Sequence, residues 1–121
     1  CLNFIKVNFK HNVNINYENS NCEDSINIRN SKGKIKNLSI KNSFADALDI
    51  DFSSLDIDTV NVWNAGNDCV DLSKGKYQFK KLILKNCGDK GVSVGEASSA
   101  VAAKTPSGPP PVPKNISTLY F

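Results

Sequence analysis

Carboxylates are concentrated in one part of this 121-residue chain, and they are the first side chains that could do chemistry. From Phe44 to Ser73 the chain contains no Lys or Arg. It contains seven aspartates there: Asp46, Asp49, Asp51, Asp56, Asp58, Asp68 and Asp71. Clustered carboxylates can hold Ca²⁺, and paired carboxylates can act as general acid and base. Lysines flank the stretch on both sides, so an acidic layer between two basic layers is the structural alternative.

Three of these aspartates are candidate metal ligands, namely Asp49, Asp51 and Asp71. If the alternating apolar runs around them are strands, all three point outward, with Asp49 and Asp71 one above the other. Stacked like charges destabilise a fold unless they are solvated or bridged, which makes Ca²⁺ a candidate cofactor. A hard cation usually takes six or more oxygen ligands, so a solvated acidic face without a cofactor is the favoured interpretation.

Trp63, the only tryptophan, is the candidate binding residue. It follows Val62 in an alternating run, so its ring is expected to point outward, with Lys41 and Lys85 as neighbours 22 residues away on either side. An outward ring can stack on a sugar, and a ring held between lysine stems by cation–π contact is the alternative. With His11 as the only histidine, a histidine-based metal site or a Ser–His relay is disfavoured.

The elements that must position these side chains follow an internal repeat. In blocks of 22 residues from Cys22 onward, the apolar residues superpose without gaps. The aligned sets are Ile26, Leu48, Val70 and Val92; Ile28, Ile50, Leu72 and Val94; Ile35, Ile57 and Phe79; Leu38, Val60 and Leu82; and Ile40, Val62 and Leu84. An earlier block fits with one extra residue, which aligns Ile15 with Leu38.

Within each block the apolar residues alternate in short runs, which is the period of a strand with one buried face. Two or three such strands in 22 residues are too closely spaced for a strand–helix repeat. Asn42, Asn64 and Asn86 recur at the same spacing, and stacked asparagines can hydrogen-bond along an axis. We therefore predict an all-β chain whose residues 1–96 form a parallel β-solenoid of about four coils, stacked about 4.8 Å apart.

Blocks of this size with an asparagine ladder resemble the right-handed parallel β-helix superfamily, which includes pectate lyases and polygalacturonases. The resemblance covers residues 2–96. The stretch NDCVDLSKGKYQFKKLILKNCGDKGVSVGE is also similar to uncharacterised β-helix segments of large bacterial surface or secreted proteins.

Three successive coils begin FADALD, GNDCVD and GDKGVS, which resemble the polygalacturonase motifs at equivalent positions. The resemblance implies Asp46 and Asp68 as the acid and base of an inverting hydrolysis. Asn67 and Lys90 stand where that family has an aspartate and a histidine, and the Arg-x-Lys substrate clamp is missing. Inverting chemistry needs carboxyls about 6.5–9.5 Å apart, whereas adjacent coils lie about 4.8 Å apart. In a lyase-type alternative, Lys90 is the candidate base beside the Ca²⁺ ligands.

The four cysteines are expected to be thiols rather than a disulfide framework. Cys69 and Cys87 align with small residues in different columns, four residues apart around the coil, a separation expected to exceed the ~7 Å Cα limit for a disulfide. Cys1 could be the lipidated first residue of a mature lipoprotein.

Residues 97–121 are expected to form a Pro-rich linker and an apolar C-terminal segment, because polyproline cannot join a central ladder. The ends of a solenoid expose unpaired strand edges. We therefore expect a homo-oligomer or filament, in which the tail adds to a neighbouring copy through four apolar residues: Ile116, Leu119, Tyr120 and Phe121.

The leading functional hypothesis is a non-catalytic extracellular or cell-surface scaffold or binding module, with polysaccharide as a possible partner. The alternative is a polysaccharide-active enzyme, a lyase or inverting glycosidase, or a fragment of one. The net charge of +3 is too small to indicate a nucleic-acid partner, and no apolar run is long enough to span a membrane.

Overall fold

The computed structural model describes residues 1–10, 12–95, 99–102 and 119–120, and everything below refers to these residues. They form strands and turns, without a helix. The strands are β1 (Leu2–Ile5), β2 (Asn8–Phe9), β3 (Asn14–Ser20), β4 (Asp24–Arg29), β5 (Lys32–Ser43), β6 (Asp46–Asp51), β7 (Ser54–Ala65), β8 (Val70–Ser73), β9 (Lys76–Cys87), β10 (Val92–Val94), β11 (Ser99–Ala102) and β12 (Leu119–Tyr120).

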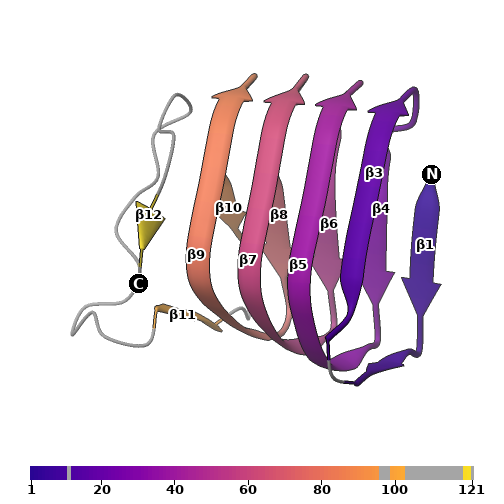
Figure 1. Ribbon diagram of the computed structural model, residues 1–121, viewed down its shortest axis with the longest axis vertical. Coiled ribbons are helices and arrows are strands. Elements are labelled where there is room, and N and C mark those ends of the chain that lie inside the picture. Colours follow the sequence, from indigo (N-terminus) through magenta and orange to yellow (C-terminus); the bar gives the residue numbers. More distant parts are fainter. Residues whose placement is uncertain (11, 96–98, 103–118, 121) are drawn as a thin grey trace.

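The strands form two facing sheets, which are the two long sides of a solenoid (Figure 1). Sheet A has the order β1-β4-β6-β8-β10, and sheet B has the order β11-β9-β7-β5-β2, with β3 also on β5 and β12 also on β9. All pairs are parallel except β12 with β9. The predicted β-solenoid of about four coils is therefore confirmed.

The register follows the 22-residue repeat. Ile40 pairs with Val62, and Val62 pairs with Leu84. The other aligned apolar sets pair in the same way, and the extra residue in the first block is confirmed because Ile15 pairs with Leu38. The interior is built from these aliphatic side chains, most of them fully buried.

Two corners of each coil are made by residues with positive φ. One corner carries Asn19, Asn42, Asn64 and Asn86, with φ between 56° and 64°. Their side chains form the predicted ladder, in which each amide donates to the Oδ1 of the asparagine one coil before, over 2.9 to 3.0 Å. Asparagine suits this corner because it tolerates the left-handed conformation better than most residues. The other corner carries Lys6, Asn30, Phe52 and Lys74, with φ between 47° and 56°.

Hydroxyl groups bind the backbone next to this second corner. Ser31 donates its N–H to the Oγ of Ser53, 3.0 Å away. In the next coil Gly75 stands where the serine would be, and the Tyr77 hydroxyl binds the backbone there instead, donating to the carbonyl oxygens of Ser73 over 2.8 Å and Ile50 over 3.1 Å. A Cβ on Gly75 would collide with that hydroxyl, so the glycine makes room for the fully buried tyrosine.

The expectation that Cys69 and Cys87 are unpaired is wrong. They form a disulfide with their Cα atoms 5.3 Å apart, and Cys1 forms a second disulfide with Cys22. Cys69 precedes β8 and Cys87 ends β9, and these two residues face each other across the narrow corner of one coil. Two coils earlier the equivalent residues, Ser25 and Ser43, hydrogen-bond through their hydroxyls over 2.7 Å. Counting residues around the coil therefore overestimated a distance that is short through space.

The C-terminal strands pair with β9 of the same chain. Ser99 to Ala102 continue the parallel stacking beyond the boundary expected at residue 96, opposite Lys76 to Phe79. Leu119 and Tyr120 lie antiparallel to Leu82 and Lys81. The expected linker between them, together with Ile116, Phe121 and His11, lies outside the described residues.

Candidate functional site

The carboxylates implied as catalytic by the polygalacturonase resemblance bind the backbone of the next coil. Asp46 Oδ1 accepts from the backbone N–H of Asp68 over 2.9 Å, and from Asn67 Nδ2 over 2.7 Å. Asp68 is 5% exposed, and its Oδ1 accepts from the backbone N–H of Lys90 over 2.8 Å. At the start of successive coils, the two carboxylates therefore accept hydrogen bonds from backbone N–H groups in place of backbone carbonyl oxygens. Asp46 and Asp68 hold the coils together, one directly above the other, a role that accounts for their equivalent positions.

The side chain of Lys90 is 58% exposed and turns to its neighbour, with Nζ 2.9 Å from Asp89 Oδ2. The Asp89 carboxylate raises the pKa of Lys90, through a hydrogen bond first and through charge second. A lyase base must lose its proton to work, so this contact acts against the role considered for Lys90.

The three candidate calcium ligands are all on the outer face of sheet A, as predicted. Asp49 pairs in register with Asp71, and Asp51 follows on the next outward position. Asp49 accepts from Asn27 Nδ2 over 2.7 Å, and Asp51 accepts from Ser73 Oγ. Burial first, and then the charges of the surrounding carboxylates, raise the pKa of Asp49 to about 7.

The same effects act on the edges of this acidic face. Burial, and then the neighbouring carboxylates, raise the pKa of Asp24 and of Asp71, and a hydrogen bond from Ser93 acts in the opposite direction on Asp71. Within the described part of the chain, no group of three or more His, Cys, Asp or Glu side chains is arranged to hold a metal ion. Asp46, Asp49, Asp51 and Asp71 are each hydrogen-bonded to an Asn or Ser side chain.

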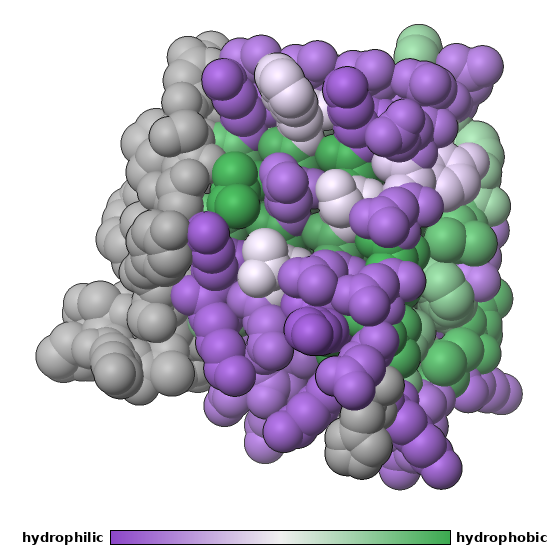
Figure 2. All heavy atoms as spheres, in the orientation of Figure 1, coloured by the Kyte–Doolittle hydropathy of each residue, from purple (hydrophilic) through white to green (hydrophobic). Residues whose placement is uncertain are grey.

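The two sheets carry charged side chains of mainly opposite sign. The charged residues in the strands of sheet A are five aspartates and one arginine: Asp24, Asp46, Asp49, Asp51, Asp71 and Arg29. Those in the strands of sheet B are eight lysines and three acids: Lys32, Lys34, Lys36, Lys41, Lys76, Lys80, Lys81, Lys85, Glu18, Asp56 and Asp58. Figure 2 shows the hydrophilic face of sheet B. The molecule therefore has one acidic side and one basic side.

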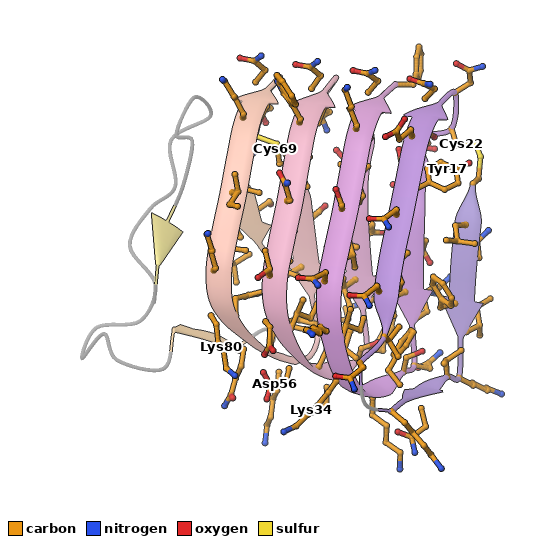
Figure 3. The ribbon with its side chains drawn as sticks, in the orientation of Figure 1. Tyr17, Cys22, Lys34, Asp56, Cys69 and Lys80 are labelled. Carbon is orange, nitrogen blue, oxygen red and sulfur yellow. A yellow bond between two sulfur atoms is a disulfide. The ribbon has the colours of Figure 1, made fainter. Side chains whose placement is uncertain are left out.

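Sheet B also has the expected layers of charge along the solenoid axis, with the aspartates of β7 between the lysines of β5 and β9. Lys34 on β5 lies 3.9 Å from Asp56 on β7, and Lys80 on β9 lies 3.2 Å from Asp58 on β7. These ion pairs gather where the long strands bend (Figure 3). They are exposed, so each contributes at most about 1 kcal/mol to stability.

Trp63 lies on the outer face of sheet B, where the repeat placed it. It pairs in register with Lys41 on one side and Lys85 on the other, and their Nζ atoms are 5.3 and 5.4 Å from the ring centroid. The indole remains 45% exposed. The predicted lysine sandwich is confirmed, and it presents two ammonium groups beside an accessible aromatic edge.

Sequence reasoning missed the second positive-φ corner as a place where function could reside. Phe52 is 47% exposed there, and Lys74 Nζ lies 4.9 Å from its ring centroid. The available signal was the 22-residue spacing of Asn30, Phe52 and Lys74, three residues of different chemistry in one column. Alignment by apolar type cannot detect such a column, because backbone conformation, not hydropathy, is what its members share.

No described helix is long and apolar enough to cross a membrane. Comparison with known proteins places this chain in no family: no family model, no curated protein and no solved structure matches it.

Proposed function

We propose that this chain is a non-catalytic extracellular scaffold that presents the basic outer face of sheet B to a polysaccharide. The observation that carries the proposal is the row formed by Lys41, Trp63 and Lys85. A tryptophan between two lysines combines an apolar edge for a sugar ring with cationic donors for its hydroxyl or acidic groups. Because the row lies on three hydrogen-bonded strands, its geometry is held before any ligand arrives.

The non-catalytic part of the proposal is supported by the hydrogen bonds of the aspartates. An inverting glycosidase needs one carboxyl free to protonate the leaving group and another free to activate a water. Asp46 and Asp68 instead accept backbone N–H groups of the following coil.

The extracellular part is supported by the two disulfides, Cys1–Cys22 and Cys69–Cys87, because disulfides form and persist mainly in oxidising compartments. Relation to the right-handed β-helix superfamily of pectate lyases and polygalacturonases belongs to the same proposal. The 22-residue coils and the asparagine ladder support it, and the departures at Asn67 and Lys90 agree with a relative that has no hydrolase activity.

The proposal also includes self-association through the N-terminal end of the solenoid. Among the described residues β1 and β3 each pair with a strand on one side only. Apolar side chains at this end are only partly buried: Leu2, Phe4, Val7, Val13 and Tyr17. Hydrophobic atoms line the corresponding edge in Figure 2. At the other end, β11 and β12 already pair with β9, so we propose the N-terminal edges of two copies as the contact.

The test for ligand binding uses the fact that Trp63 is the only tryptophan, so its emission reports on this surface alone. We expect uronate-containing polysaccharides to shift the emission and to retard the protein in affinity electrophoresis. Trp63→Ala should weaken the retardation. Phe44→Ala is the control, because Phe44 is an aromatic residue that is 71% exposed and lies just past the end of β5, outside the row of Lys41, Trp63 and Lys85. Retardation of Trp63→Ala equal to that of the wild type, or no retardation of the wild type, would overturn the proposal.

A further inference from the structure

A groove of about 540 Å³ runs along the second positive-φ corner, where sheet A turns into sheet B. It crosses the coils from β2 to the start of β9, far along the strands from Trp63. Four lysines line it: Lys6, Lys32, Lys74 and Lys76. Its volume lies within the range of about 300–1,000 Å³ that is typical of small-ligand sites.

The register explains how the lysines come together. Lys74 follows Phe52 in the corner column, and Lys76 pairs with Ser54 in the neighbouring column, which continues to Lys32 one coil earlier. Ser54 thus lies between Lys32 and Lys76 in its column, and Phe52 lies between Asn30 and Lys74 in the corner column. Contact with the Phe52 ring, 4.9 Å from Lys74 Nζ, restrains one ammonium group at the groove.

The positive charge of the groove is not balanced by nearby acids. Among the described residues, the ion pairs within 4 Å involve Lys34, Lys80 and Lys90 and none of the groove lysines. No Asp or Glu lines the groove. Positive groups in a shared concave surface repel one another, and an anion bound among them would relieve that repulsion.

We infer that this groove binds an anionic sugar unit, with a carboxylate or sulfate held by Lys32, Lys74 and Lys76 and the sugar ring against Phe52. Asn8 and Ser54 supply amide and hydroxyl groups for the sugar hydroxyls. A nucleic acid fits less well, because single strands are bound by stacking successive bases and one aromatic ring lines this groove. The choice of a sugar rests on the proposed function, whereas the preference for an anion rests on the groove alone.

The test is isothermal titration of the full chain with three short oligosaccharides of equal length, one uronate, one sulfated and one neutral, and with a single-stranded DNA oligomer. We expect the uronate or the sulfated sugar to bind, and the neutral sugar and the DNA to bind at least about tenfold more weakly. Raising the salt concentration from about 50 mM to about 500 mM should weaken the binding of the anionic sugar. Whichever anionic sugar binds more tightly identifies the acidic group.

The variant Lys74→Gln/Lys76→Gln should lower the affinity for the anionic sugar by about tenfold or more, a loss of at least about 1.4 kcal/mol. Lys36→Gln is the matched control, because it removes an exposed lysine from the same sheet outside the groove. Trp63→Ala should bind the short anionic sugar as the wild type does, which separates this site from the Trp63 row. Equal binding of neutral and anionic sugars, tighter binding of DNA, or unchanged affinity in the double variant would overturn the inference. Thermal unfolding of each variant verifies that it is folded.

Discussion

At the scale of single residues, side chains that could act as catalysts are used to bind the backbone. Asp46 and Asp68, to which the resemblance to polygalacturonase motifs assigned the roles of acid and base, both accept N–H groups of the following coil. Tyr77 binds the backbone in a similar way, and burial raises the pKa of its hydroxyl to about 12. Within the described residues every buried side-chain N or O atom has a hydrogen-bond partner. These polar groups therefore stabilise the stacking of coils.

Asp68 allows a direct test of this structural role. Asp68→Asn keeps an oxygen that can accept from the Lys90 N–H, so the free energy of unfolding should stay near that of the wild type. Asp68→Ala leaves the buried N–H without an acceptor, which costs about 1–3 kcal/mol. Chemical denaturation measures both. Equal stability of the two variants would show that the Lys90 N–H does not depend on this carboxylate.

Asp49 should make stability depend on pH. Burial, followed by the carboxylates of sheet A, raises its pKa in the folded state to about 7, above the value of 3.8 for an isolated group. Between these values the folded state binds more protons than the unfolded state, so stability falls as pH rises. We expect the melting temperature to be higher at about pH 5 than at about pH 8. Asp49→Asn should flatten this dependence and stabilise the protein at the higher pH.

Asp58→Asn is the control for the pH experiment, because it removes one carboxylate from the opposite sheet, beside Lys80. It should leave the pH dependence in place. A melting temperature that rises with pH in the wild type between about pH 5 and pH 8 would contradict the assignment of a raised pKa to Asp49.

At the scale of the elements, one narrow corner recurs in each coil. There the last residue of a sheet B strand faces a residue at the start of, or just before, the sheet A strand of the same coil. Successive coils fill this place with a serine pair, an alanine pair and a cysteine pair: Ser25 with Ser43, Ala47 with Ala65, and Cys69 with Cys87. The two members of each pair are of the same type, a correspondence that can be recognised only once the structure shows which residues meet at the corner. Equivalent corners of the same protein are thus filled by three different types of residue pair.

These three pairs define matched variants. Cys69→Ser/Cys87→Ser reproduces the serine pair, and Cys69→Ala/Cys87→Ala reproduces the alanine pair. Both should keep the fold and lower the free energy of unfolding by about 2–4 kcal/mol, because the disulfide restricts the unfolded chain. Denaturation under non-reducing conditions measures the loss, with the Cys1–Cys22 disulfide intact in every protein. Loss of the circular dichroism signal of β-structure in both variants would show that the corner cannot form without the cross-link.

At the scale of the whole molecule, the solenoid separates charge and leaves its two ends different. Sheet A is acidic, sheet B is basic, and the basic side carries both the Trp63 row and the corner groove. β9 receives β11 and β12 at the C-terminal end of sheet B. The N-terminal end presents strand edges and partly buried apolar side chains, a combination that invites pairing with another chain.

Self-association through the N-terminal end should therefore respond to a charge placed there. Ile5 on β1 is 58% exposed, so Ile5→Lys adds a charge at this edge without disturbing the core. We expect the wild type to form dimers as concentration rises in sizing chromatography with light scattering, and Ile5→Lys to shift that transition to higher concentration. Val94→Lys on β10, at the opposite end, is the control, and Val94 is 49% exposed. A wild type that stays monomeric throughout would refute the association.

The sequence by itself determined the coil length, the strand register and the outward position of Trp63. The coil length and the register depend on contacts between residues 22 apart, which a repeat displays directly, as in Ile40, Val62 and Leu84. The position of Trp63 depends on the alternation of side chains along a strand. Only the tertiary structure decided what meets across a coil or around its corners. Cys69 and Cys87 pair, Tyr77 replaces a serine hydroxyl above Gly75, and Phe52 and Lys74 share a groove because of the left-handed backbone at that corner. A repeat aligns positions along the axis of a solenoid, but the distances across it depend on where the backbone bends.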